Sequence, residues 1–312
     1  MSAQGEQAVA QNGGLIKRQD ICAVVVTYFP QASSVENLPA LSKQVGRLLI
    51  VDNGSGSSSF DLLEGTAQPP ETVILRLGSN LGIAAALNVG LRFAHEHGYR
   101  WLGTFDQDSR TTPGMLEEMA CALASYPRPE EVAVITPCHV DQRLNFTVRE
   151  RACEAAGDGW RTIRSAMTSG NLVRVAAALS IGGFDESLFI DLVDHDFCLR
   201  LRGHGYRVLE ATRARLLHSL GSMERRLLAF KRVNVTHHPA IRRYYMSRNR
   251  IILWRRHWRQ EPAWVLRDLR RFLSESLCIV LYERQTGGKL RMIIRGIGDA
   301  IRHRCGPFRE GG

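Results

Sequence analysis

The sequence predicts an α/β fold built on a doubly wound, Rossmann-like sheet. Three observations support this prediction: short apolar runs recur between residues 21 and 106, polar residues follow them, and segments with helical character separate them. Apolar runs without polar alternation are typical of strands buried on both faces of a parallel sheet.

The order of these segments gives the expected elements. We expect strands at 21–28, 47–55 (with a turn at its end), 72–77, 101–106, 132–137 and 205–208. Helices are expected at 35–46, 83–97, 113–125 and 197–202, with one more ending near 181. The polar stretch 138–165 is expected to be an irregular insertion that faces the substrate.

Polar side chains close four of the predicted strands. In open α/β sheets, ligands bind outside the carboxyl ends of the strands. We therefore expect the following residues to lie along one edge: Thr27, Tyr28, Asp52, Asn53, Asn80, Asp106, Gln107 and Asp108. Neither G-x-G-x-x-G after the first strand nor G-x-x-x-x-G-K-[ST] occurs, which argues against a dinucleotide enzyme and a P-loop NTPase.

The bulk composition narrows the class of protein. A chain of 312 residues with 44% hydrophobic content can bury one large core, and no apolar run is long enough for a transmembrane helix. Residues 1–19 are expected to be a disordered leader, because they are rich in Gln, Gly and Ala and lack an apolar core segment. Seven scattered cysteines without a C-x-x-C pair favour reduced thiols in a cytoplasmic protein over a zinc or disulfide framework.

The basic excess is concentrated at the C-terminus. Residues 241–312 carry 17 Lys and Arg against 6 Asp and Glu, whereas residues 1–240 carry 24 against 25. This asymmetry predicts a negatively charged partner, such as membrane phospholipid, nucleic acid or an anionic substrate.

The segment 101–110 carries the first candidate chemistry, since an apolar strand runs directly into Asp106-Gln107-Asp108. Side chains two apart in a strand point to the same face, so both carboxylates would face one point. Such a pair favours a hard cation, Mg²⁺ or Mn²⁺, between them. The alternative is a surface turn with two solvated acids.

A second acidic segment lies at 184–196, where Asp191, Asp194 and Asp196 stand among apolar residues. Carboxylates in apolar surroundings have raised pKa values, which suits a general base. For Asp196 we favour a different role, an ion pair with Arg200 one helical turn later. His218 follows Leu216-Leu217 and is either a satisfied polar residue or a third metal ligand, which would favour Mn²⁺.

Seven motifs in series resemble the inverting GT-A glycosyltransferases of family 2 and, within them, the bacterial rhamnosyltransferases. They cover residues 21–250 and read V-V-V-T-Y-F, V-D-N-G-S, N-L-G-I-A-A-A-L-N, F-D-Q-D-S, S-G-N-L-V, G-G-F-D-E-S-L-F-I-D-L-V-D-H-D-F-C-L-R and H-P-A-I-R-R-Y-Y-M-S-R-N-R. Many relatives carry an acidic pair before the last helix of the sixth motif, whereas Val193 takes the first place here.

The resemblance implies a role for each matched residue. Asp106 and Asp108 would hold a divalent ion on the donor diphosphate, with His218 as an additional ligand. Asp194 would be the catalytic base, with Asp191 beside it. The nucleotide-sugar would be bound by Thr27, Tyr28, Asp52, Asn80, Gly82, Asn88, Asp106 and Gln107, with Asp52 accepting from the pyrimidine N3–H.

The resemblance also implies an activity. The expected function is metal-dependent, inverting transfer of L-rhamnose from dTDP-L-rhamnose to a hydroxyl of a glycolipid or polysaccharide. Such acceptors include lipopolysaccharide O-antigen, other cell-envelope glycans and rhamnolipid-type molecules. The alternatives are the same chemistry with another sugar nucleotide, such as a UDP-hexose, and a non-catalytic nucleotide-sugar-binding module.

The resemblance implies a GT-A catalytic domain with a doubly wound mixed sheet at 20–238, and a basic helical region is predicted at 239–312. In the latter, Trp264, Val265, Leu269, Phe272, Leu273, Leu277 and Val280 are expected near one face of a helix flanked by Arg267, Arg270 and Arg271. This face would either lie in an anionic membrane interface or pack on the catalytic domain. Nucleic acid is not expected, because no recognised binding module accompanies the charge. The expected location is the cytoplasm, peripheral on the inner face of the cytoplasmic membrane.

Overall fold

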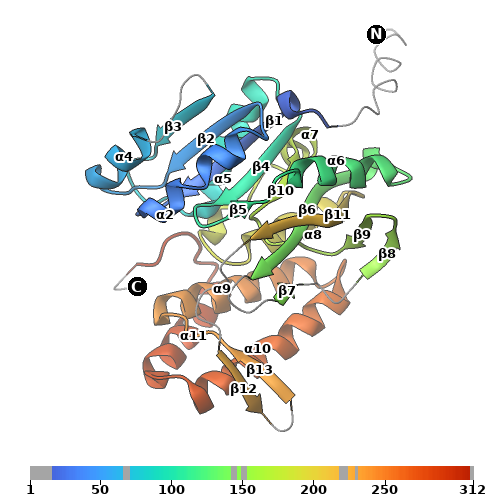
Figure 1. Ribbon diagram of the computed structural model, residues 1–312. Helices are drawn as coiled ribbons and strands as arrows, with labels where there is room; N and C mark the ends of the chain where they lie inside the picture. The colour runs from blue at the N-terminus through green and yellow to red at the C-terminus, as the bar shows by residue number, and fades with distance from the viewer. Residues whose placement is uncertain are drawn as a thin grey trace, which may run out of the picture.

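The computed structural model describes residues 16–65, 71–141, 146–148, 153–217, 224–228 and 231–309. Within these residues, eleven strands form one mixed sheet with the order β3-β2-β1-β4-β10-β6-β11-β9-β8, while β5 pairs with β11 and β7 pairs with β6. Figure 1 shows this sheet with helices on both faces. The prediction of an α/β fold with a mixed, doubly wound sheet is confirmed.

The strands follow the apolar segments closely. Their bounds are β1 Ile21–Thr27, β2 Arg47–Asp52, β3 Thr72–Arg76, β4 Trp101–Asp106, β5 Arg110–Thr111, β6 Val132–Asp141, β7 Phe146–Val148, β8 Cys153–Gly157, β9 Trp160–Ile163, β10 Asn171–Arg174 and β11 Arg207–Leu217. β1 runs parallel to β2 and β4, and β10 runs antiparallel to β4 and β6. All seven residues of β1 are buried, as expected of a strand covered on both faces.

Helices cover both faces of the sheet. Those of the N-terminal three quarters are α2 Ala32–Val35, α3 Leu38–Ser42, α4 Ser57–Glu64, α5 Ile83–Glu96, α6 Met115–Ser125, α7 Val175–Ser180 and α8 Val193–Gly203, with short 3₁₀ helices η1 Arg18–Asp20, η2 Pro129–Glu131 and η3 Glu186–Leu188. Alternate residues of β1 enter two cores. Val24 and Val26 join the core under α5, α7 and α8, and Ala23 and Val25 join the core under α3 and α6.

Two sequence predictions about this region are wrong. The single helix expected at 35–46 is two short helices, and Pro39 lies in the first turn of the second, where a missing N–H is tolerated. The insertion expected to be irregular contains β7, β8 and β9, of which β9 pairs with β11. These strands are short, and their sequences, FTV, CEAAG and WRTI, lack the sustained apolar alternation that would predict a sheet edge.

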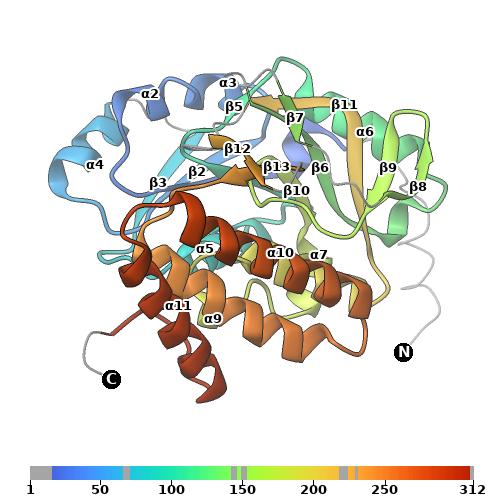
Figure 2. The same cartoon turned by 90° about the horizontal axis from the view of Figure 1, so that it is seen from below.

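The C-terminal region forms a helical layer that contacts α8 and the loop before it. It consists of α9 Ala240–His257, α10 Pro262–Tyr282 and α11 Thr286–Ile301, and the hairpin β12 Glu224–Leu228 and β13 Lys231–Val235 precedes it. Figure 2, viewed from below, shows the three helices in front of the sheet. α11 approaches α9 closely at Gly296, where a Cβ atom would lie 2.5 Å from the carbonyl oxygen of Tyr244.

The apolar residues of α10 do not share one environment. Trp264 and Val265 are buried and contribute to the core with α8, whereas Leu273, Leu277 and Val280 are exposed. The expectation that these residues form one face is therefore wrong, because they extend around too much of the helix for one partner to cover. Within the described ranges, no helix has the length and apolar composition needed to cross a bilayer.

Candidate active site

The carboxyl ends of the central strands lie side by side. The pairing of β1 with β2 places Thr27 opposite Asp52, and the pairing of β1 with β4 places Val26 opposite Asp106. The expected gathering of polar residues at one sheet edge is confirmed for these positions. It follows from the parallel direction of the three strands.

Hydrogen bonds connect these strand ends. The carboxylate of Asp52 is buried and accepts from the Thr27 hydroxyl at 3.4 Å and from the Ser55 amide at 3.1 Å. The Asn53 amide donates to the Asn80 side chain at 3.2 Å. Because an ionised carboxylate has about four acceptor positions, Asp52 retains capacity for a ligand N–H.

An exposed apolar rim surrounds this polar edge. Tyr28, Phe29 and Leu81 are 46%, 55% and 48% exposed, and the rings of Tyr28 and Phe29 meet edge to face at 4.7 Å. The backbone amide of Phe29 donates to the Ser55 hydroxyl at 2.8 Å. Sequence reasoning singled out Tyr28 and missed Phe29, although Phe29 belongs to the V-V-V-T-Y-F motif.

The two carboxylates of the Asp-Gln-Asp segment are arranged by a turn. β4 ends at Asp106, and the amide of Ser109 donates to the Asp106 carbonyl at 3.1 Å, which closes a β-turn over Gln107 and Asp108. The expectation that strand alternation orients both acids is therefore wrong. Gln107 connects this turn to the neighbouring strand, because its side-chain oxygen accepts from the Tyr28 amide at 2.9 Å.

The metal ligands predicted from the sequence are only partly described. Asp106 is half-buried and Asp108 is exposed, and His218 lies outside the described residues. In the described part of the chain, no group of three or more His, Cys, Asp or Glu side chains could hold a metal ion. Two carboxylates nonetheless suit Mg²⁺ or Mn²⁺, which complete their coordination with water and substrate phosphates.

The acidic loop before α8 has an unusual backbone. Phe189, Asp191 and Leu192 have φ angles of 64°, 65° and 62°. Residues other than glycine rarely adopt such positive φ angles. Such conformations persist only where surrounding contacts hold them, and they cluster at functional sites. Helix α9 supplies the contacts that hold this loop.

Two buried side chains of α9 bind the carbonyl groups of this loop. Asn249 donates its amide to the carbonyls of Leu188, Ile190 and Asp191 at 2.9, 2.8 and 2.8 Å. Arg248 donates to the Leu188 carbonyl at 2.9 Å. The R-N pair of the last quoted motif therefore fixes the backbone of the acidic loop, a role that its sequence did not reveal.

Asp191 forms an ion pair with Arg242 at the start of α9. The guanidinium Nη2 and Nε lie 2.9 and 3.1 Å from Asp191 Oδ1, and Nε lies 3.2 Å from Oδ2. Burial raises the pKa of Asp191, Arg242 opposes this effect, and the charge of Asp194 adds to it. Asp191 and Asp194 are thus close enough for their charges to interact.

Arg242 connects the acidic loop to the strand edge. Burial acts to lower the pKa of Arg242, but the charges of Asp191, Asp106 and Asp194 raise it above its ordinary value. Carboxylates from β4, the loop and α8 therefore share one electrostatic neighbourhood. Sequence reasoning did not find Arg242, and the only signal was its place in the H-P-A-I-R-R motif.

Asp194 and Asp196 differ in their surroundings. Asp194 is half-buried, and its Oδ1 accepts from the His195 amide at 2.8 Å. Asp196 is completely buried and contacts Arg200 at 2.7 Å, Arg256 at 2.6 Å and His257 at 3.1 Å. Burial acts to raise the pKa of Asp196, but these three partners lower it to about 2. The predicted pair with Arg200 is confirmed.

Gly82 joins the strand-edge loops to the acidic loop. Its φ angle is 89°, and a Cβ atom there would lie 2.5 Å from the carbonyl oxygen of Phe189. The same carbonyl accepts from the Ile83 amide at 2.8 Å. The side-chain amide of Asn88 donates to the Phe184 carbonyl and to the Glu186 carboxylate, so it joins α5 to the segment before the acidic loop. A contact between Asn88 and the nucleotide stays a prediction.

Comparisons with known proteins agree with this geometry. Residues 23–164 match glycosyl transferase family 2. The chain therefore contains a domain of that family, and it is a glycosyltransferase.

Particular relatives define the likeness further. The chain is 29% identical over 248 residues to the dTDP-rhamnosyl transferase RfbF of Shigella flexneri, covering 76% of this chain and 80% of that protein. It is 28% identical over 250 residues to the galactofuranosyltransferase GlfT1 of Mycobacterium tuberculosis (strain CDC 1551 / Oshkosh), covering 74% and 81%. The crystal structure of GalNAc-T7 with UDP, GalNAc and Mn²⁺ has the same fold, with a TM-score of 0.60 and 10% identity over 81% of this chain and 50% of that one.

Proposed function

We propose that the protein transfers a sugar from a sugar nucleotide to an acceptor hydroxyl with inversion of configuration. The observation that carries this proposal is the ion pair of Arg242 with Asp191, at a guanidinium that the charges of Asp106 and Asp194 also influence. This grouping supports a shared site for a donor-side carboxylate, Asp106, and a base, Asp194, as a single displacement requires. The match of residues 23–164 to glycosyl transferase family 2 supports the same reaction class.

The donor would lie on the strand edge. Thr27, Asp52 and Asn80 would bind the nucleoside, and the exposed ring of Tyr28 would stack on the base. Gly82 would allow close approach of the backbone, and Gln107 would hold the turn against β1. These assignments extend the resemblance to residues that the structure brings together.

Asp106 and Asp108 would hold a divalent ion, with His218 as the expected additional ligand. Bound there, Mg²⁺ or Mn²⁺ would neutralise charge that develops on the leaving diphosphate. The crystal structure of GalNAc-T7, which has the same fold and contains UDP and Mn²⁺, supports this choice of ion.

Asp194 is the proposed base. It removes the acceptor hydroxyl proton while that oxygen bonds to the anomeric carbon, and the bond from this carbon to the diphosphate oxygen breaks. One displacement inverts configuration, whereas retention would require a nucleophile and a second step. Asp191 is bound on both oxygens by Arg242, so we assign it the positioning of the loop.

The substitution Asp194→Asn tests this assignment. Turnover should fall by roughly 10²–10⁴-fold while nucleotide affinity stays within about twofold, since only the proton acceptor is lost. Asp158→Asn, which changes an exposed acid elsewhere, is the matched control. Near-normal turnover in Asp194→Asn would show that another group is the base.

For the donor, we propose dTDP-L-rhamnose, supported by the likeness to RfbF. The likeness to GlfT1 keeps a second sugar nucleotide as the alternative. A thermal-shift panel of dTDP, UDP and GDP with and without Mn²⁺ separates them. Stabilisation by dTDP alone supports rhamnose transfer, stabilisation by UDP alone favours a UDP-hexose, and binding without turnover of any donor would indicate a non-catalytic module.

For the acceptor, we propose a glycolipid or lipid-linked glycan at the inner face of the cytoplasmic membrane. Support comes from the exposed apolar stripe of α10, which consists of Leu266, Leu273, Leu277, Val280 and Leu281. Arg267, Arg270 and Arg271 flank this stripe and are exposed. Apolar side chains bordered by arginines suit an anionic bilayer surface.

A further inference from the structure

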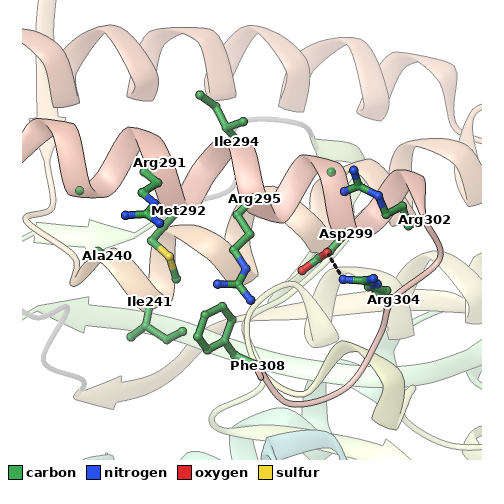
Figure 3. A pocket seen from close by; sticks show the side chains of 12 residues that line it. Ala240, Ile241, Arg291, Met292, Ile294, Arg295, Asp299, Arg302, Arg304 and Phe308 are labelled. Atoms are coloured by element: carbon green, nitrogen blue, oxygen red, sulfur yellow. Dashed lines mark ion pairs between the residues drawn. The ribbon is translucent and has the colours of Figure 1, made fainter. Parts of the chain in front are cut away.

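A large concave pocket lies between α9, α11 and the chain that follows α11. It has a volume of about 1150 Å³, which is ample for the headgroup and first carbons of an amphiphile. Figure 3 shows its lining, with side chains from the start of α9 on one side and from α11 and residues 302–308 on the other.

The pocket has an excess of positive charge. Four arginines line it, Arg291, Arg295, Arg302 and Arg304, against the single carboxylate of Asp299. Asp299 is already engaged, because it accepts from the Tyr244 hydroxyl at 2.9 Å and lies 3.6 Å from Arg304. Among the described residues, no carboxylate pairs with Arg291 or Arg302, so both are available to an anion.

Apolar side chains stand beside these arginines. Ile241 and Ile294 are 40% and 70% exposed, and Met292 and Phe308 complete the apolar lining. Arg295 lies over the Phe308 ring at 4.4 Å and donates to the Arg309 carbonyl at 2.7 Å, which fixes its orientation. A ligand that combines an anionic group with an apolar chain matches both features.

The pocket adjoins the catalytic loop. Ala240 and Ile241 line it at the first turn of α9, and the next residue is Arg242, which binds Asp191. The N-terminus of this 18-residue helix directs its partial positive charge to the same side. An anion held there would lie at the N-terminus of α9, beside the residue that binds Asp191.

We propose that this pocket binds the diphosphate and proximal isoprenoid of a lipid-linked acceptor, which deepens and rests on the proposed transferase function. The arginines would bind the phosphate oxygens, for which guanidinium geometry is suited. The isoleucines, Met292 and Phe308 would cover the first carbons of the chain. A flat bilayer contact is disfavoured here because the surface is concave and α10 carries the exposed stripe.

Farnesyl diphosphate is a soluble probe for this chemistry. It is titrated into the full chain by calorimetry with saturating dTDP or UDP and Mn²⁺ present, so that the donor diphosphate site is blocked. The variant Arg291→Glu/Arg302→Glu should weaken binding by on the order of tenfold or more. The matched control Arg267→Glu/Arg270→Glu changes the same charge on α10, outside the pocket, and should leave binding within about twofold.

Two comparison ligands and a vesicle assay complete the test. Farnesol and inorganic pyrophosphate should each bind at least about tenfold more weakly than farnesyl diphosphate, since each lacks one half of the ligand. The proposal is overturned if the pocket variant binds farnesyl diphosphate as tightly as the wild type. It is also overturned if the α10 control loses as much affinity as the pocket variant. It is also overturned if the pocket variant loses only its binding to phosphatidylglycerol vesicles, which would make the surface a bilayer contact.

The failure of the transferase proposal has a different signature. In that case no nucleotide stabilises the protein and no donor is turned over, whereas the affinity for farnesyl diphosphate and its dependence on Arg291 and Arg302 are still measured directly.

Discussion

Arg242 on α9 binds Asp191 through both guanidinium nitrogens that face it, at 2.9 and 3.1 Å from one carboxylate oxygen. The pair joins the basic C-terminal region to the loop that precedes Asp194. With Asn249 and Arg248, it makes α9 a structural support of the catalytic loop. The division at residue 239 stays a prediction, but these contacts make residues 240–257 necessary for the geometry of the site.

Replacing Arg242 should therefore affect catalysis more than folding. In Arg242→Ala, the loop loses a bidentate contact, and turnover should fall about 100-fold because small displacements of a base are costly. The free energy of unfolding should fall by only about 1 kcal/mol, since the arginine is half-exposed. Steady-state kinetics and urea unfolding measure the two effects.

Arg242→Lys is the informative companion variant. Lysine keeps the charge but lacks the planar fork, so it should restore turnover only partly. Full restoration by lysine would mean that charge alone matters, contrary to a positioning role.

Asp196 should govern stability and not chemistry. Asp196→Asn leaves Arg200, Arg256 and His257 without their common carboxylate and should cost about 3 kcal/mol. Thermal unfolding should shift down by roughly 6–12 °C. Asp194→Asn breaks none of these three contacts and should shift the unfolding temperature by less than about 2 °C. The reverse order of the two shifts would exchange the two roles.

Gly82 should be intolerant of a side chain. Gly82→Ala combines a φ angle of 89° with a Cβ atom 2.5 Å from the Phe189 carbonyl oxygen. The free energy of unfolding should therefore fall by about 2–3 kcal/mol. Gly78 has a φ angle of 74° but no atom within 4 Å of its Cβ position. Gly78→Ala should thus cost only about 1 kcal/mol. Equal costs would show that the contact with Phe189 is unimportant.

His238 should make stability depend on pH. Burial, together with the charges of Arg242 and Arg243, lowers its pKa from 6.5 to about 4. The unfolded chain therefore binds a proton at higher pH than the folded protein, and stability falls as pH drops from about 6.5 towards 4. The loss between pH 7 and 5 should be about 1 kcal/mol after solvent screening.

Chemical unfolding of the wild type and His238→Gln at pH 7 and 5 isolates this contribution. The wild type should lose more stability than the variant over that interval. An identical loss in both proteins would assign the pH dependence to other groups.

The exposed stripe of α10 should mediate attachment to anionic vesicles. Leu273→Glu/Leu277→Glu should abolish pelleting with phosphatidylglycerol vesicles, because the change removes apolar contact and adds negative charge. Leu179→Glu, an exposed leucine on α7, is the control and should pellet normally. Pelleting of the α10 variant at wild-type levels in low salt would contradict a membrane role for this helix.

Local patterns in the sequence were sufficient for much of the fold. The apolar runs predicted where β1 to β4 begin and, within three residues, where they end, because burial on both faces requires such runs. The pair Asp196–Arg200 followed from helical spacing alone. By contrast, β8 and β9 and the hairpin β12–β13 have weak patterns and were not predicted.

The sequence by itself determined which residues end the central strands and which segment is acidic, because those properties depend on neighbours along the chain. Only the tertiary structure decided that Asp106 and Asp108 lie on a turn and that Gly82 lies against Phe189. It also decided that Arg242 binds Asp191 and that α10 buries Trp264 while exposing Leu273. These relationships join residues that are distant in the chain, or depend on which side of a helix a partner covers. The spacing of apolar residues along the chain cannot predict either kind of contact.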